Sequence, residues 1–147
     1  MAIQIGYDPK FIGDGINIPL PTFNRSLGQS VRRRDKLRKR QYSDHEHFTI
    51  VMHEDTRQLI YSAYNIDQSK FLQDTKGKGE KSWSLDSNYL KAHQLNNNYY
   101  NDREDSNGDE IPNPYDRGHM VMRYNNMWGT EEEADLAGKA TFIYSNA

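Results

Sequence analysis

Four consecutive residues, DRGH at 116–119, bring together groups that could cleave a phosphate ester. The His119 imidazole titrates near neutral pH and can take a proton from water. The Arg117 guanidinium is a permanently charged fork that suits a phosphate, and Gly118 leaves room for a bulky substrate backbone. Asp116 can hold either partner by a charge-assisted hydrogen bond. Phosphodiester hydrolysis requires such a base and such a cation, with a metal to complete charge neutralisation. Taken alone, the tetrapeptide fits a buried salt bridge at a strand end equally well.

Two other motifs could hold a metal, and neither has a sufficient set of ligands. The stretch DREDSNGDE resembles a calcium loop, but with Gly108 in the sixth position the first ligand position falls on Arg103 and the twelfth on Pro114. A cation and a proline cannot replace the carboxylates that calcium needs. His45 and His47 would face one side of a strand, but no third ligand is spaced nearby. We therefore expect an ordinary histidine pair at a strand edge.

The composition excludes several classes of protein. The chain has 147 residues, a net charge of −2 and a mean hydropathy of −1.03, which is typical of one polar domain rich in loops. Ten tyrosines and two tryptophans argue against disorder. Because there is no cysteine, any metal must be held by oxygen or histidine. No apolar run approaches the roughly 20 residues of a membrane span, and MAIQIGYDPKF lacks the pattern of a signal peptide. We therefore expect no membrane partner, with the cytoplasm as the default compartment.

The net charge hides a basic segment between Arg25 and Arg40, where Asp35 is the one acid. Such a run could bind the phosphates of a nucleic acid, but short basic runs more often form a solvated helix face or a flexible arm. Composition alone therefore does not establish nucleic-acid binding. The basic residues of the segment are Arg25, Arg32, Arg33, Arg34, Lys36, Arg38, Lys39 and Arg40.

The elements that precede DRGH can be outlined from residue types. HFTIVM (47–52) and LIYSAYNI (59–66) are rich in β-branched and aromatic residues, and the polar segment between them can turn the chain, which predicts a β-hairpin. Segments 68–82 and 96–114 are expected to be loops. Residues 1–40 are expected to be a loosely structured part of the single domain 1–147, because GDGINIPLPT is rich in Gly and Pro.

After DRGH, the sequence predicts a short helix and a short strand. Thr130 as N-cap, with Glu133 three residues later, forms a capping box, and Gly138 is expected to end the helix. ATFIYSN (140–146) is expected to form another strand. Strands, a polar loop, a strand, a helix and a strand in this order predict an α+β fold around an antiparallel sheet.

The motifs around DRGH resemble those of one family. They are GYDPKFIG and IPLPT near the start, HFTIVM and YSAYNID in the predicted hairpin, YDRGHMVMR followed by WGT, and TFIYSN. Together they resemble the DNA/RNA non-specific endonucleases, the ββα-metal (His-Me finger) nucleases that include endonuclease G. The resemblance runs through most of the chain. It implies a ββα-metal fold and metal-dependent, sequence-non-specific hydrolysis of DNA and RNA, with magnesium or alternatively manganese as the cofactor.

The resemblance also implies roles for the matching residues. His119 matches the general base that activates water, Arg117 the arginine that stabilises charge on the phosphate, and Asp116 the acid that opens the motif. Asn146 matches the asparagine whose side-chain oxygen is the direct protein ligand to magnesium. Such a neutral oxygen suits magnesium, which keeps several waters and binds substrate phosphate. Without the resemblance, Asn146 would be interpreted as a cap at a strand end.

Two further residues are expected to contact substrate, and two depart from the resemblance. Arg123 lies in the YDRGHMVMR block, and Lys81 takes the place of a phosphate-contacting arginine, as a point charge rather than a fork. Met122 and Tyr124 depart from it, because many relatives carry a basic and an acidic residue there.

The end of the sequence is a larger departure. Members of the resembled family continue past the asparagine into a helix, whereas Ala147 is the last residue here. We therefore expect a C-terminally incomplete nuclease domain: a fragment, a truncated product, or a chain completed by another segment or a second copy. Asn146 is expected to fray, since chain ends do so unless tied down. The alternative is a weak or inactive nucleic-acid-binding remnant of such a nuclease.

Overall fold

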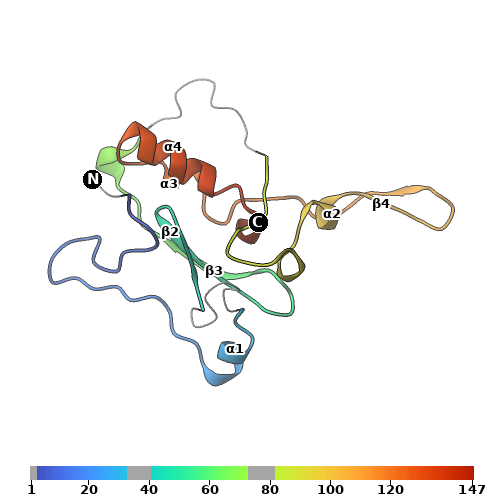
Figure 1. Ribbon diagram of the computed structural model, residues 1–147, viewed down its shortest axis with the longest axis horizontal. Helices are drawn as coiled ribbons and strands as arrows, with labels where there is room; N and C mark the ends of the chain where they lie inside the picture. The colour runs from blue at the N-terminus through green and yellow to red at the C-terminus, as the bar shows by residue number, and fades with distance from the viewer. Residues whose placement is uncertain (1–2, 33–40, 73–81) are drawn as a thin grey trace.

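The computed structural model describes residues 3–32, 41–72 and 82–147 (Figure 1). The described strands form one three-stranded antiparallel sheet, in the order β1-β2-β3, and one separate two-stranded ribbon, β4-β5. In chain order the helices and strands are α1 (Arg25–Gln29), β1 (Ser43–His45), β2 (Phe48–Met52), β3 (Leu59–Tyr64), α2 (Asn97–Tyr100), β4 (Arg103–Glu104), β5 (Glu110–Ile111), α3 (Arg123–Asn126) and α4 (Glu131–Ala140), with short 3-10 helices at Gln68–Lys70, Lys91–His93 and Tyr144–Asn146.

The predicted hairpin is confirmed as β2 and β3, which pair from Phe48 opposite Tyr64 to Met52 opposite Leu59. The sequence reasoning missed β1, and it placed His47 wrongly in the strand. His47 lies in the turn between β1 and β2, with a positive φ of 67°, and is almost fully buried. The two histidines therefore do not share one strand, and the expected strand-edge pair is not formed.

The core lies on β2, all of whose residues are buried. Phe48, Ile50 and Met52 pack with three residues from distant parts of the chain, Tyr89, Val121 and Ile143. Val121 follows the DRGH stretch closely, and Ile143 belongs to the C-terminal segment. Burial of these apolar side chains therefore draws both segments onto the same strand.

Helix α4 begins as predicted and ends later than predicted. Thr130 and Glu133 form the capping box, in which each side chain accepts a hydrogen bond from the backbone of the other. The helix continues through Gly138 to Ala140. Gly138 is buried, and a Cβ at this position would lie 2.9 Å from Met127 Cγ. This glycine permits close contact between α3 and α4 and does not end the helix.

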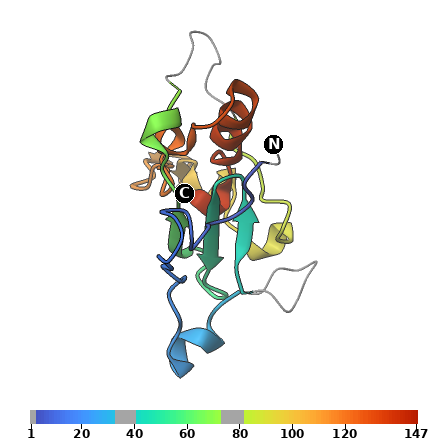
Figure 2. The same ribbon diagram turned by 90° about the vertical axis from the view of Figure 1, so that its left-hand side faces the viewer.

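The predicted strand at 140–146 is wrong. Ala140 ends α4, and Tyr144–Asn146 form a 3-10 helix. One parallel bridge joins Ile143 to Ser84. The apolar character of this segment reflects burial, because residues 141 to 146 are all buried, rather than pairing in a sheet. In Figures 1 and 2 the C-terminus lies close to the sheet.

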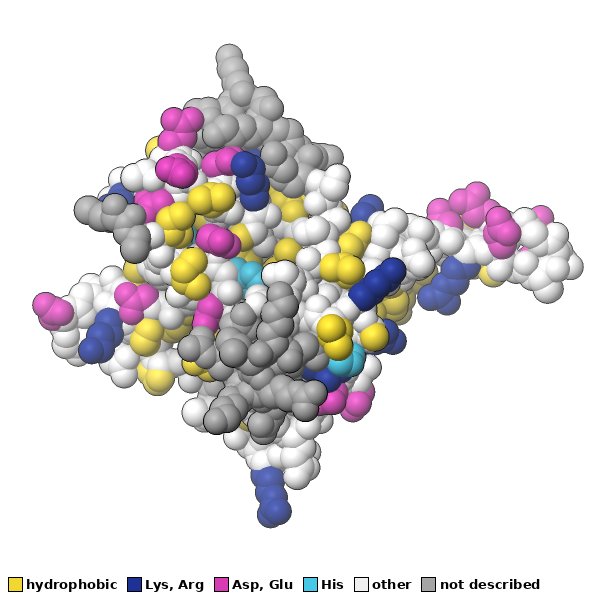
Figure 3. Space-filling view, in the orientation of Figure 1, with side chains coloured by type: hydrophobic (Ala, Val, Ile, Leu, Met, Phe, Trp, Pro, Cys, Tyr) yellow, Lys and Arg dark blue, Asp and Glu magenta, His cyan; other side chains and the backbone are white. Residues whose placement is uncertain are grey.

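The predicted loop at 96–114 contains α2 and the ribbon β4–β5, which pairs Arg103 with Ile111 and Glu104 with Glu110. This ribbon projects from the body of the molecule (Figure 1). Acidic side chains gather along it in Figure 3. All four strand residues are exposed, so the ribbon contributes little to the core.

The three-stranded sheet has helices at its two ends. Helices α3 and α4 contact each other at one end, and α1 lies beyond the other in both views (Figures 1 and 2). The prediction of mixed helix and antiparallel sheet is confirmed. Among the described residues, no helix is long and apolar enough to cross a membrane.

Candidate active site

The DRGH stretch lies in the chain between the projecting ribbon and α3, and it is fixed from behind by the C-terminal segment. The Met120 N–H donates to the backbone oxygen of Asn146 at 3.0 Å. Val121, one residue further on, is fully buried in the core. His119 is half-buried, while Asp116, Arg117 and Gly118 are exposed. The backbone after His119 is thus anchored, and the motif itself faces outward.

Two aromatic rings hold the His119 imidazole. The Trp83 ring centre lies 4.7 Å from it, and Phe142 makes an edge contact at 4.5 Å. Burial, and then the positive charge of Arg123, lower the pKa of His119 from its ordinary value of 6.5. Its Nε2 atom is buried and has no hydrogen-bond partner among the described residues. The imidazole is therefore neutral at neutral pH, and one of its ring nitrogens makes no hydrogen bond with the described residues.

Two arginines, Arg117 and Arg123, line the same cavity as this imidazole. Arg117 donates from Nη1 to Asn97 Oδ1 at 2.8 Å, so helix α2 orients it. Arg123 begins α3, and its Cζ lies 5.8 Å from the centre of the Phe142 ring and 5.7 Å from that of Tyr124. Contacts of this kind hold a cation over an aromatic face without consuming its charge. The site is therefore positively charged beside a neutral base.

A cavity of about 460 Å³ joins these groups. It brings together three of the predicted site residues, His119, Arg117 and Arg123. The complete lining consists of Trp83, Arg117, His119, Met122, Arg123, Tyr124 and Phe142.

Asp116 and Gly118 lie outside the lining of this cavity. Asp116 makes no hydrogen bond or ion pair with the described part of the chain, so its predicted holding of Arg117 or His119 is not seen in this arrangement. A Cβ at Gly118 would meet nothing within 4 Å, so there is open space at this position. Before the motif, Tyr115 stacks on Tyr99 of α2 with ring centres 5.9 Å apart.

Asn146 is tied into the structure, and the expectation that it frays is wrong. Its side chain is 0% exposed. Oδ1 accepts from Val121 N–H at 2.8 Å, and Nδ2 donates to the carbonyl oxygens of Val121 at 3.2 Å and Thr141 at 2.9 Å. Ser145 beside it donates to the buried carboxylate of Asp86 at 2.9 Å. These hydrogen bonds hold Asn146 in place although it lies near the end of the sequence.

Lys81 lies outside the described residues. Within the three described segments, no group of three His, Asp or Glu residues could hold a metal ion.

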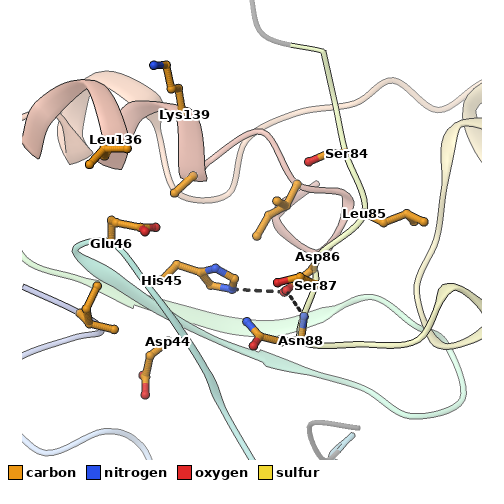
Figure 4. A pocket seen from close by; sticks show the side chains of 13 residues that line it. Asp44, His45, Glu46, Ser84, Leu85, Asp86, Ser87, Asn88, Leu136 and Lys139 are labelled. Atoms are coloured by element: carbon orange, nitrogen blue, oxygen red, sulfur yellow. Dashed lines mark hydrogen bonds and ion pairs between the residues drawn. The ribbon is translucent and has the colours of Figure 1, made fainter. Parts of the chain in front are cut away.

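A second cavity, of about 570 Å³, lies between β1 and α4 (Figure 4). His45 Nε2 there lies 3.2 Å from Asp86 Oδ2. Burial alone would raise the pKa of Asp86, but the hydrogen bond and charge of His45, together with hydrogen bonds from Asn88 and Ser145, lower the pKa overall. Asp86 also accepts from Asn88 N–H and the Ser145 hydroxyl. This buried carboxylate is satisfied by the protein itself and joins β1 to the C-terminal segment.

Sequence reasoning missed the residues that position the predicted ones. Trp83 and Phe142 hold the imidazole, and Asn97 orients Arg117. Phe142 lies within the TFIYSN block, so its place in that motif could have marked it as a site residue. Trp83 and Asn97 are far from DRGH in the sequence, and neither spacing nor periodicity connects them to it.

A protein family and a curated relative match this chain in sequence. The family model described as DNA/RNA non-specific endonuclease matches residues 30–147. The chain is 27% identical over 150 residues to the uncharacterized protein y4fB of Sinorhizobium fredii (strain NBRC 101917 / NGR234), a match covering 96% of this chain. The chain spans about 20% of that relative's length. No solved structure matches it. The family match covers most of the chain and includes the whole pocket, and the protein belongs to the DNA/RNA non-specific endonuclease family.

Proposed function

We propose that the protein is a metal-dependent endonuclease that hydrolyses phosphodiester bonds in DNA and RNA without sequence preference, with His119 as the general base. The observation that carries the proposal is the unpartnered Nε2 of His119 beside Arg117 and Arg123 in one pocket. Membership of the family supports nuclease activity in general. We also propose that the hairpin and the segment after DRGH belong to a ββα-metal fold.

In this proposal, His119 removes a proton from the attacking water. A base works in its neutral form, and the lowered pKa keeps the imidazole neutral at neutral pH. Trp83 and Phe142 restrict the orientation of the ring, which helps to hold the base where water attacks phosphorus.

The two arginines have complementary tasks in the proposal. Arg117 is exposed and is oriented by Asn97, so its guanidinium can bind two oxygens of the scissile phosphate. Arg123 contributes positive charge at the same pocket. Contacts to phosphate carry no sequence information directly, which agrees with cleavage at any sequence. Asp116 is proposed to act only once substrate brings its carboxylate close to Arg117 or His119.

Magnesium, or alternatively manganese, would take one ligand from Asn146. The amide oxygen has two lone pairs, and the hydrogen bond from Val121 uses one of them. Few protein ligands suffice for magnesium, which binds waters and substrate phosphate as well. Because Asn146 is fully buried, a metal would reach this oxygen only after local movement of the chain around it. When bound, the ion would neutralise charge on the phosphate.

The test is plasmid nicking by the purified chain in magnesium, with His119→Ala compared with the unchanged protein. We expect a loss of about 10²–10⁴-fold, since this is the usual contribution of general base catalysis. Arg117→Lys should recover only part of the activity lost in Arg117→Ala, because an ammonium lacks the guanidinium fork. His53→Asn is the matched control, since His53 accepts backbone hydrogen bonds in the turn after β2, outside the pocket. Nicking by His119→Ala at the wild-type rate would overturn the assignment.

The second candidate is a nucleic-acid-binding remnant with little or no turnover. Three of the four hydrogen-bonding positions of the Asn146 amide are engaged, which favours this candidate, because a metal must compete with these contacts. Binding of DNA and RNA without cleavage, in magnesium and in manganese, would support this candidate. Light scattering of the same sample tests whether a second copy takes part.

A further inference from the structure

The pocket has more apolar wall than phosphate cleavage needs. A phosphate is bound by cations and hydrogen-bond donors, and here Arg117, Arg123 and His119 supply those functions. Four other lining residues are aromatic or apolar. Trp83 and Phe142 are accounted for, because they hold the imidazole. Met122 contacts no group that the proposed chemistry requires, and the one such group at Tyr124 is the Arg123 guanidinium, 5.7 Å from its ring centre.

The side chains of Met122 and Tyr124 are about half exposed to solvent. Met122 is 50% exposed and Tyr124 is 49% exposed. Both lie at the start of α3, on either side of Arg123, and both line the cavity. An apolar wall that is left in water beside a charged site is typical of a binding surface for an amphipathic ligand.

The volume of the cavity indicates the size of that ligand. About 460 Å³ lies within the range of small-molecule sites and far exceeds the space that one phosphate needs. Gly118, which precedes His119, has open space where a side chain would lie, although it is outside the cavity lining. A nucleotide has the matching chemistry, with one anionic group and one flat apolar face.

We propose that Tyr124 and Met122 form a base-stacking subsite, so that the pocket takes an unpaired nucleotide of a single strand, with its phosphate at Arg117 and its base against the Tyr124 ring. The inference rests on the proposed function and names its substrate class. Aromatic side chains stack on any base, because every base has a π-face, so the subsite requires no sequence. Bases within a duplex are already stacked and must be extruded before they can enter a pocket.

The test measures binding separately from cleavage. The full chain is titrated with two single strands of equal length in EDTA: an oligothymidylate, and a strand of abasic sugars with the same phosphates. We expect the oligothymidylate to bind about 5- to 150-fold more tightly, which corresponds to the usual contribution of stacking one base on an aromatic ring. Quenching of 2-aminopurine in a third strand reports the stacking directly.

Variants assign the preference to Tyr124. Tyr124→Leu keeps an apolar side chain and should lose most of the difference between the two strands, whereas Tyr124→Phe keeps the ring and should retain it. Arg117→Ala should weaken the binding of both strands, because it removes a phosphate contact. In magnesium, Tyr124→Leu should slow cleavage of single strands more than cleavage of a duplex.

Equal affinity for the two strands, or an unchanged difference in Tyr124→Leu, would overturn the subsite while leaving the proposed function intact. Failure of every strand to bind, together with the absence of plasmid nicking, would overturn both. A preference for duplex that survives Tyr124→Leu would show that the wall serves another purpose.

Discussion

At the scale of single residues, the acid–base properties of His119 follow from its surroundings. Burial and the nearby Arg123 both disfavour the imidazolium, so the pKa of His119 lies below 6.5. Because the neutral form is the active base, activity should rise with pH through this lowered pKa and be complete at neutral pH. A histidine with the ordinary pKa would become fully neutral only at higher pH.

We therefore expect Arg123→Gln to move the acid limb of the pH profile. Removal of the positive charge favours the imidazolium and raises the pKa of His119, so the rise in kcat/KM should shift to higher pH. Burial, the larger cause, remains, so the pKa should stay below 6.5. The profile of kcat/KM from pH 4 to 8 measures the shift, and Arg103→Gln on the distant ribbon is the control. A uniform fall in rate with an unmoved profile would show that Arg123 acts on substrate alone.

At the scale of elements, the C-terminal segment acts as a clamp on the chain behind DRGH. Asn146 bonds to Met120 and Val121, and Ser145 bonds to Asp86. Ile143 adds an apolar contact to the core on β2. A change in this segment should thus disturb stability as well as the site.

Asn146→Ala tests this clamp. The change leaves the buried Val121 N–H without its acceptor, so we expect a loss of about 1–3 kcal/mol in the free energy of unfolding. Urea unfolding measures it, with the exposed Asn98→Ala as the matched control, for which we expect a change within about 0.5 kcal/mol. Equal unfolding midpoints for the two variants would show that the Asn146 contacts contribute nothing to stability, and would leave the residue free for a metal role alone.

At the scale of the whole molecule, charge is unevenly placed. The projecting ribbon and its turn carry exposed acids, while the pocket carries two arginines. Acids near a nucleic-acid path repel the phosphates within about 10 Å at 0.1 M salt. The ribbon should therefore limit how nucleic acid approaches.

Neutralisation of the ribbon tests this effect. We expect the triple variant Glu104→Gln, Asp109→Asn and Glu110→Gln to bind nucleic acid more tightly at low salt, with the gain lost as salt increases. Asp105 is left unchanged, because it holds the turn by accepting from Asn107 and Asp109 N–H groups. Since the substituted residues are exposed, stability should change by about 0.5 kcal/mol or less. A salt-independent gain would contradict the electrostatic explanation.

The sequence by itself determined features that depend on neighbouring residues. The hairpin of β2 and β3 follows from residue types, and the capping box at Thr130 from two residues three apart. The family followed from short blocks around DRGH. Local patterns gave wrong predictions of secondary structure where burial determined the conformation. The apolar run 140–146 resembles a strand but forms the end of α4 and a 3-10 helix. Gly138 does not end the helix; it allows close contact with Met127.

Only the tertiary structure decided what surrounds the candidate base. Trp83 and Phe142 line the pocket and Asn97 binds Arg117; the three come from separate parts of the chain, and no spacing rule links them. The same holds for Asn146, which the sequence placed beside a chain end and the fold buried behind His119. Such contacts form because the core on β2 gathers distant apolar residues, and a pattern of neighbouring residues does not contain that information.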